Sequence, residues 1–121
     1  MVLLTKAIRE VLLGNHEATQ QAEERGESVD HWPVVKLFTA WAGATWLLTE
    51  LDEEGARLFG LCDLGLGFPE LGYVSLAELE ALRGPGGMRV ERDQYFRARG
   101  PLSAYAEAAR AAERIVELPA R

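Results

Sequence analysis

Imidazole and thiol groups, which commonly serve as the base and the nucleophile in catalysis, are few in this sequence of 121 residues. His16 and His31 are the available imidazole bases, and Cys62 is the one thiol. Cys62 lies in an apolar run beside Leu61, where a free cysteine more often serves as a small buried side chain than as a nucleophile. We therefore do not expect a catalytic pair of Cys62 and His31.

Two carboxylates, Asp63 and Glu70, bracket a segment rich in glycine. If this segment folds back, the two acids could converge, with or without His31, to hold a hard cation or to act as an acid and a base. Alternatively, Glu70 accepts hydrogen bonds from the backbone N–H groups that such a loop leaves unpaired, which is the role we favour. We predict no catalytic residue, no metal and no cofactor.

Arginines gather towards the C-terminus, interleaved with Tyr95 and Phe96, and could contact phosphates while the rings stack on bases. The chain is acidic overall, however, with 13 basic and 19 acidic residues and a net charge of −6, whereas nucleic-acid binders usually carry a basic surface. Nucleic-acid binding is therefore a less favoured alternative, and its candidate residues are Arg83, Arg89, Arg92, Arg97 and Arg99.

The acids are concentrated in residues 50–80, which hold one arginine against eight acidic side chains. Such a segment could imitate the charge of a nucleic acid and block a nuclease, although the net charge of the whole chain is modest for a mimic. A dipolar surface of this kind can also steer an ordinary protein partner.

The elements that must position these side chains predict an α+β fold. Thr5 can cap a helix that begins near Leu4 and stops at Gly14-Asn15, and residues 16–30 form either a helical turn or a loop. Strands over 33–39, 44–51 and 56–62 are joined by connections so short that they must pair antiparallel. On the second strand Trp46, Leu48 and Glu50 should share one face.

Further elements follow this meander. Ser75 and Glu78 form a capping box that begins a short helix, which ends at Gly84-Pro85. Residues 88–92 alternate as a strand with Met88 and Val90 inward, and a last helix runs from Leu102 to about Leu118. We expect residues 1–121 to form one domain, with four or five antiparallel strands packed against N-terminal, short central and C-terminal helices.

The segment Asp63-Leu-Gly-Leu-Gly-Phe-Pro-Glu-Leu-Gly72 is an apolar loop, because its glycines alternate with large apolar residues. We favour a loop tucked under the sheet; the alternative is an exposed apolar patch for a partner. The second case gives the candidate interaction surface, a rim that comprises Trp41, Asp63, Leu66, Phe68 and Glu70.

This glycine-rich centre, together with Pro33-Val-Val-Lys-Leu-Phe38, Arg83-Gly-Pro85 and Pro101-Leu-Ser-Ala-Tyr105, resembles a family of small uncharacterised bacterial proteins that are commonly encoded on plasmids and other mobile elements. The resemblance spans about residues 3–110. This chain departs from the family pattern at Ala40-Trp41, where a Pro-Asp-like turn is usual, and at residues 86–89. The resemblance implies a mobile-element setting and assigns no functional residue.

Taken together, these features lead us to expect a non-enzymatic protein-interaction module of a mobile element, and inhibition of a host defence protein or nuclease is the specific role we consider for it. The alternatives stay open: a small metal-assisted enzyme that uses Asp63 and Glu70, or the nucleic-acid binder described above. No apolar stretch approaches the ~20 residues of a membrane span, and the first residues lack the basic and apolar regions of a signal peptide, so we expect a cytoplasmic protein without membrane contact.

Overall fold

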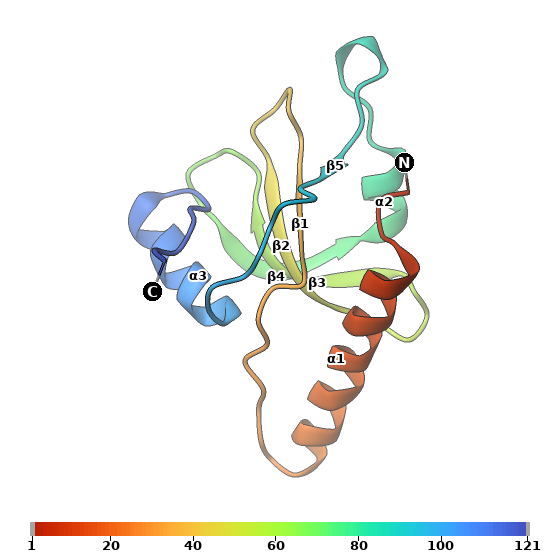
Figure 1. Cartoon of the computed structure of the whole chain (residues 1–121), viewed down its shortest axis with the longest axis vertical. Helices are drawn as coiled ribbons and strands as arrows, with labels where there is room; N and C mark the ends of the chain where they lie inside the picture. Colours follow the sequence, from red (N-terminus) through yellow and green to blue (C-terminus); the bar gives the residue numbers. More distant parts are fainter. Residues whose placement is uncertain (1, 121) are drawn as a thin grey trace.

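The computed structural model describes residues 2–120 and contains one antiparallel sheet of five strands in the order β4-β3-β2-β1-β5. Three helices accompany the sheet, which confirms the predicted α+β class (Figure 1). In chain order, the elements are α1 (Lys6–Glu24), β1 (Val35–Phe38), β2 (Thr45–Leu51), β3 (Arg57–Asp63), β4 (Glu70–Ser75), α2 (Leu76–Ala81), β5 (Glu91–Arg92) and α3 (Leu102–Ala112).

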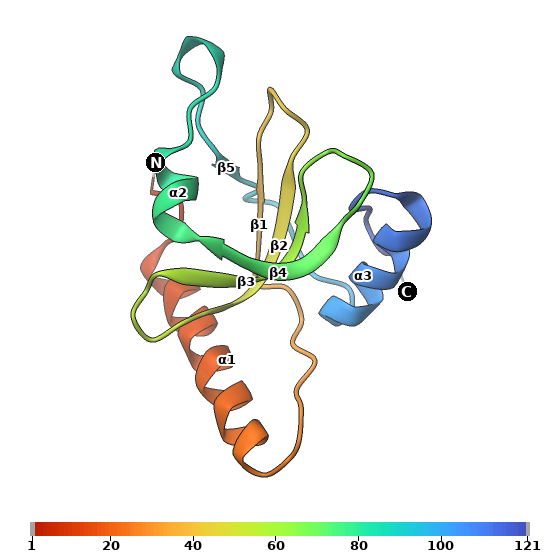
Figure 2. The same cartoon turned by 180° about the vertical axis from the view of Figure 1, so that it is seen from behind.

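Each face of the sheet has its own apolar cluster. On one face, which we call the α1 face, Leu48 and Leu58 pack with Leu12 of α1 and with Leu76 and Leu79 of α2. On the other, the α3 face, the side chains of the central strands pack against α3; this cluster comprises Leu47, Leu61, Leu102, Tyr105, Ala106 and Ala109. The views in Figures 1 and 2 look at the sheet from its two edges, with α1 and α2 on one side and α3 on the other.

The first helix is longer than predicted. It does not stop at Gly14-Asn15 but continues to Glu24, because the Asn15 side chain donates to the Thr49 carbonyl oxygen of β2 and leaves the helical backbone intact. The glycine that ends α1 is Gly26, whose φ of 71° lets the chain turn back while its N–H donates to the Glu23 carbonyl oxygen. Thr5 is the N-cap, as predicted, and accepts a bond from the Ile8 N–H.

The second strand contains a β-bulge that the sequence pattern did not predict. Leu48 lies opposite Gly60, whereas Glu50 already lies opposite Phe59, so Thr49 is the extra residue. The bulge reverses the alternation after Leu48. Glu50 therefore leaves the face of Trp46 and Leu48, where strict alternation placed it, and joins the α3 face.

Three other boundaries differ from the predictions. The second half of the expected 63–72 loop is strand β4, and the strand expected over 88–92 is reduced to Glu91–Arg92, with Met88 exposed. The last helix ends at Ala112 rather than near Leu118, because Glu113 adopts a left-handed conformation and the next turn leaves the helix. Ser75 caps α2 as predicted, since its hydroxyl accepts a bond from the Glu78 N–H.

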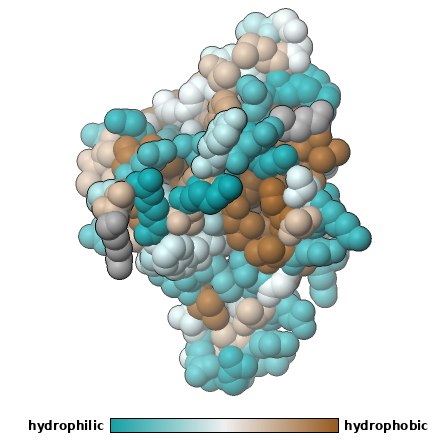
Figure 3. All heavy atoms as spheres, viewed as in Figure 1, coloured by the Kyte–Doolittle hydropathy of each residue, from teal (hydrophilic) through white to brown (hydrophobic). Residues whose placement is uncertain are grey.

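The side of the molecule that carries β5 is mostly hydrophilic. Figure 3 shows this side, where brown atoms gather between β1 and the start of α1 and teal atoms cover much of the remainder. Beside this cluster the N-terminal segment, α2 and β5 enclose a hollow of about 400 Å³, which Val2, Leu79, Glu80 and Arg89 help to line.

Candidate functional site

The β3–β4 loop projects its apolar side chains into solvent. Leu66 is 73% exposed and Phe68 is 76% exposed, so the expectation of a loop tucked under the sheet is wrong. Gly65 and Gly67 both have positive φ values, and these let the loop turn outward without strain. The structure thus presents two residues of the candidate interaction surface as free apolar side chains.

Asp63 holds this loop in place from the inside. It is only 3% exposed, and its carboxylate accepts from the Gly65 N–H at 2.8 Å and from the Ile115 N–H at 2.9 Å. The second bond ties the segment after α3 to the end of β3. Asp63 is therefore a structural anchor behind the surface and lies outside the exposed rim.

Glu70 is exposed at the start of β4, opposite Cys62 in the β3–β4 pairing. Residues opposite one another share a face, and Asp63 follows Cys62, so Glu70 and Asp63 project to opposite faces of the sheet. The structure does not bring the two carboxylates together into the acid pair or cation site considered from the sequence.

Trp41, the remaining residue of the predicted rim, lies in the β1–β2 turn and is half-buried. Its ring packs flat against Gly84, where a Cβ atom would lie 2.3 Å from the ring. The turn that carries Trp41 touches the β3–β4 loop, because a Cβ on Gly65 would lie 3.2 Å from the Ala42 carbonyl oxygen. Trp41 therefore packs against Gly84 beside the loop, and its side chain is less exposed to solvent than those of Leu66 and Phe68.

The apolar surface continues along β4, which is an edge strand. Tyr73 is 64% exposed and Leu71 is 50% exposed, and both point to the α3 face because they lie opposite Phe59 and Leu61. Figure 2 shows β4 in the foreground, and none of the helices in residues 2–120 crosses in front of it. A shallow groove of about 550 Å³ separates this part of β4 from α3, and its walls include Leu61, Phe68, Leu71, Ala106 and Arg110.

The free edge of β4 also carries unused backbone groups. The Leu76 N–H bonds the Ala56 carbonyl oxygen, which fixes the alternation of the β3–β4 ladder. Val74 and Gly72 then bond β3, while the N–H and C=O groups of Leu71 and Tyr73 and the N–H of Ser75 point away from it. The Ser75 carbonyl oxygen is already used, because Ser75 is the N-cap residue of α2 and accepts the first bond of that helix. Within residues 2–120, this edge meets no other strand.

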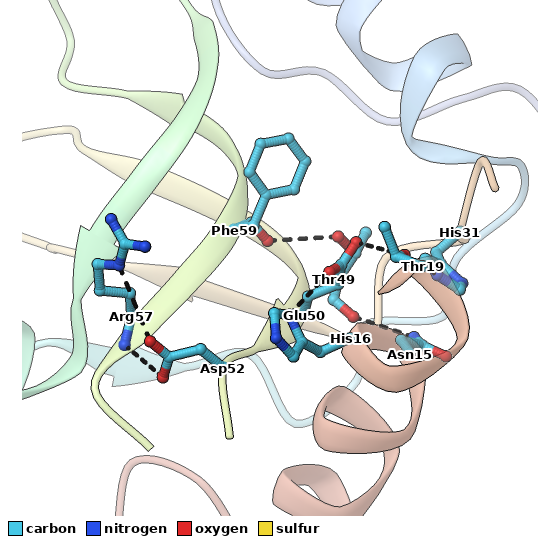
Figure 4. A network of polar contacts seen from close by, with 9 residues as sticks. All are labelled: Asn15, His16, Thr19, His31, Thr49, Glu50, Asp52, Arg57 and Phe59. Atoms are coloured by element: carbon cyan, nitrogen blue, oxygen red, sulfur yellow. Dashed lines mark hydrogen bonds and ion pairs between the residues drawn. The ribbon is translucent and has the colours of Figure 1, made fainter. Parts of the chain in front are cut away.

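A polar cluster lies beside the edge strand, and sequence reasoning missed it. The bulge places Glu50 on the α3 face, where Thr19 Oγ1 donates to Glu50 Oε2 at 2.9 Å and His16 Nδ1 lies 3.3 Å from Glu50 Oε1. His31 Nε2 lies 2.9 Å from the same threonine hydroxyl. Figure 4 shows His16 and Thr19 of α1 next to Glu50, with His31 of the 27–34 segment on the far side of Thr19. The residues are as much as 34 positions apart and follow no motif, so no sequence signal indicated the cluster.

The hydroxyl of Thr19 settles the bonding roles in this cluster. A threonine hydroxyl has one proton, and Thr19 gives it to the Glu50 carboxylate. The oxygen must then accept a bond from His31 Nε2–H, so His31 cannot act as a base towards Thr19. This arrangement clamps α1, β2 and the 27–34 segment together and does not activate a nucleophile.

The cluster opens into two hollows that share Phe59 and Glu50. One, of about 310 Å³, lies between α1 and Tyr73 and includes Glu23; the other, of about 270 Å³, reaches Leu71 and the start of α3. The 27–34 segment is fixed between them, since the Asp30 carboxylate accepts from the Ser103 N–H and the His31 carbonyl oxygen accepts from the Leu102 N–H.

Comparison with protein families places the chain. The model of the family described as "Protein of unknown function (DUF2958)" matches residues 3–116. The chain belongs to this family. No curated protein and no solved structure matches it.

In this DUF2958 chain, Cys62 is a poor candidate for a nucleophile. Burial raises the pKa of its thiol, which keeps it protonated at neutral pH. Its side chain also lies on the α1 face, next to the cluster around Leu58, whereas His31 lies beside the α3 face.

The arginines of residues 83–99 mostly bind nearby backbone carbonyl groups. Arg92 Nη1 donates to the carbonyl oxygens of Val2 and Leu3, at 2.9 and 2.6 Å, and so holds the N-terminal segment. Arg83 and Arg89 both donate to the Glu80 carbonyl oxygen, near the end of α2. Two more bind further carbonyl oxygens, Arg97 that of Phe96 and Arg99 that of Leu118. Nucleic-acid binding by this segment of the DUF2958 chain stays a prediction.

Two further features are absent from the described part of the DUF2958 chain. Among residues 2–120, no three side chains of histidine, cysteine, aspartate or glutamate lie close enough to hold a metal ion. Over the same residues, no helix combines the length and apolar character that crossing a membrane requires.

Proposed function

We propose that the chain is a protein-binding module that uses the apolar surface of the β3–β4 loop and β4, which we call the β4 surface and define as Leu66, Phe68, Leu71 and Tyr73. The observation that carries this proposal is the exposure of all four side chains along one continuous segment. Single exposed apolar residues are ordinary, but contiguous apolar patches on a protein surface mark sites of interaction.

The rigid support of this surface also favours binding. Asp63 fixes the base of the loop, and Phe59 packs against the Tyr73 ring with 5.1 Å between the centroids. A surface held in place in the free protein loses little conformational entropy when a partner binds. The resemblance to proteins of mobile elements makes a host protein, such as a nuclease or another defence component, the expected class of partner.

Site-specific photocrosslinking tests the proposal. A photoreactive phenylalanine analogue at position 68 should form a crosslink to one host protein, and the same analogue at position 95 serves as the control. Tyr95 is even more exposed than Phe68 but lies on the β5 side, next to Glu91 and Asp93. Equal crosslinking at both positions would contradict the proposal. A crosslink at position 68 that persists unchanged in a Leu66→Asp background would also contradict it.

A further inference from the structure

We infer that the partner contributes an extended segment, which joins the sheet antiparallel as a sixth strand beside β4 and carries both apolar and basic side chains on the α3 face. This inference rests on the proposed function and specifies the chemistry of the partner. Its evidence is the free backbone edge, the row of hollows along β4 and the charges that surround them.

The outer edge of β4 has backbone groups that another strand can bond. Leu71 and Tyr73 each direct an N–H and a C=O away from β3, and Ser75 adds an outward N–H, so a second chain can form the same ladder on the outer side of β4. Strand addition of this kind obtains affinity from main-chain bonds and specificity from pockets for alternate side chains.

Three hollows lie in a row along β4. On the α3 face, the groove of about 550 Å³ lies at Phe68 and Leu71, the hollow of about 270 Å³ lies at Leu71 and Phe59, and the hollow of about 310 Å³ lies at Phe59 and Tyr73. Leu71 and Tyr73 are two residues apart in one strand, a separation of roughly 7 Å. An added strand has the same repeat, so its alternate side chains would meet successive hollows.

The composition of the hollows decides which side chains fit. The groove at Phe68 is walled by Leu61, Leu71 and Ala106, which favour an apolar side chain. The hollow at Tyr73 is lined by two acidic residues, Glu23 and Glu50, and Glu50 keeps 13% of its side chain exposed although His16 and Thr19 bind it. A lysine or arginine would meet both acids and the aromatic rings of Phe59 and Tyr73.

The other charged groups at this end are few. Arg57 lies over the ring of Tyr73, 4.8 Å from its centroid, and His16 adds an imidazole next to Glu50. In the groove at the opposite end, Arg110 is accompanied by Glu113, while the side chain of Glu70 projects to the other face of β4. Residues 50–80 as a whole hold one basic and eight acidic side chains, which favours a basic partner.

A second copy of this chain fits the edge less well. Pairing β4 with β4 would bring residues 50–80 of two copies close together, each with one basic and eight acidic side chains, and surfaces of like charge repel one another. The partner strand is therefore expected from a different protein. Sedimentation of the full chain gives the corresponding readout: a monomer supports the inference, and a dimer abolished by Leu71→Pro would overturn it.

The direct test uses capped nine-residue peptides with the full chain. In the first peptide, even positions alternate valine with arginine and odd positions are threonine; in the second, glutamate replaces arginine. Binding of the first peptide should shift the amide resonances of Leu71, Tyr73 and Ser75 and slow their hydrogen exchange. The arginine peptide should bind at least about fivefold more tightly than the glutamate peptide, as expected for paired charges. Equal affinities, or unshifted amides, would overturn the inference.

N-methylation separates strand addition from docking by side chains alone. In antiparallel pairing, residues that direct side chains to the α3 face opposite Leu71 and Tyr73 also direct their N–H groups to β4. Methylation of the valine and arginine nitrogens should abolish binding, whereas methylation of the threonine nitrogens should leave it intact. Equal binding of both methylated peptides, or the reverse preference, would overturn antiparallel addition.

Variants of the chain complete the design. Leu71→Pro removes an outward N–H without breaking a bond to β3, and Leu71→Ala is its control because it shortens the side chain but keeps the N–H. Glu23→Gln with Glu50→Gln should weaken the arginine peptide about fivefold, and Glu24→Gln, an exposed neighbour outside the hollow, should not. If these results fail while the crosslink at position 68 persists, strand addition is wrong and the proposed function stands.

Discussion

β5 and β4 are the two edge strands of one sheet, and they differ in length, charge and cover. β5 has two residues, Glu91 and Arg92, both charged, and Arg92 ties it to the N-terminal segment. β4 has six residues, exposes Leu71 and Tyr73, and faces solvent along its outer side (Figure 2).

Proteins usually protect exposed edges with short strands, charged side chains or covering segments, because an open edge can pair with any other chain. β5 shows all three devices and β4 shows little more than the charge of Glu70. The two edges of the sheet therefore differ in kind, because the edge at β4 is open and the edge at β5 is closed. The proposed binding role would account for this asymmetry, and the predictions below test the difference between the two edges in order of decreasing effect.

The largest effect is expected at Gly60, which lies in β3 opposite the bulge. A Cβ on Gly60 would lie 2.0 Å from the Leu47 carbonyl oxygen, so Gly60→Ala must push β2 and β3 apart. We expect a loss of about 3 kcal/mol or more in the free energy of unfolding, measured by urea denaturation.

Gly72→Ala is the matched control for this change. Gly72 pairs with Gly60 on the β4 side, and no atom lies within 4 Å of its Cβ position. The substitution should leave stability nearly unchanged. A large loss at Gly72 would show that β4 is packed as tightly as the centre of the sheet, and the comparison of the two edges would then fail.

A smaller effect is expected at the closed edge. Arg92→Ala removes two bonds from a guanidinium to the carbonyl oxygens of Val2 and Leu3 and should cost about 1.5 kcal/mol. Arg97→Ala is the control, because Arg97 binds only the carbonyl oxygen of its neighbour Phe96. Hydrogen exchange at Leu37 and Phe38, which pair with β5, should rise in the first variant alone. Equal stability of the two variants would contradict a closed edge held by Arg92.

The features of the fold that could be predicted from the sequence are the local ones. The meander, the cap at Ser75 and the short central helix all follow from residues within a few positions of one another. The bulge at Thr49 does not follow from nearby residues. Strict alternation was the simpler pattern for this strand, and the Thr49 carbonyl oxygen is bonded by Asn15, which lies 34 residues away. The helix stop at Gly14-Asn15 failed for the same reason, since a tertiary contact outweighed a weak local preference.

The candidate surface was predicted in part. Leu66 and Phe68 were named from their place in a glycine-rich loop, but their exposure could not be read from a pattern that fits a tucked loop equally well. Asp63 was considered from the sequence as part of an acid pair or cation site. In the structure it accepts bonds from the Gly65 N–H and from the Ile115 N–H, which is 52 residues away in the sequence. The Glu50 cluster depends on the bulge, so it could not be predicted from the sequence either.

A third prediction concerns pH and the hairpin that sets the register of β3. The backbone N–H of Arg57, and to a lesser extent that of Ala56, lowers the pKa of the Asp52 carboxyl below its usual value of 3.8. A lowered pKa in the folded state stabilises the protein above that usual value, and the stabilisation is lost as the pH falls through the folded pKa. Asp52→Asn should therefore reduce stability at pH 7 and have little effect at pH 3, in paired urea titrations.

Glu53→Gln is the control for Asp52, because this neighbouring acid is exposed in the same turn and should show no such dependence on pH. If Asp52→Asn destabilises equally at both values of pH, the loss comes from packing and not from the carboxylate. The hairpin would then hold β3, and through it the open edge, by a mechanism that does not depend on charge.

The smallest effect on stability is expected at the open edge itself. Leu66→Ser with Phe68→Ser removes two large side chains that are mostly in solvent, so the free energy of unfolding should change by no more than about 0.5 kcal/mol. Binding of a hydrophobic fluorescent dye should nevertheless fall, since these residues form the centre of the exposed apolar surface, whereas Tyr95→Ser on the β5 side should leave it unchanged. A pair of residues that contributes little to folding but exposes two large apolar side chains is what a binding site requires. A loss of stability comparable with that of Arg92→Ala would instead assign Leu66 and Phe68 to the packing of the fold, and the edge at β4 would then be covered rather than open.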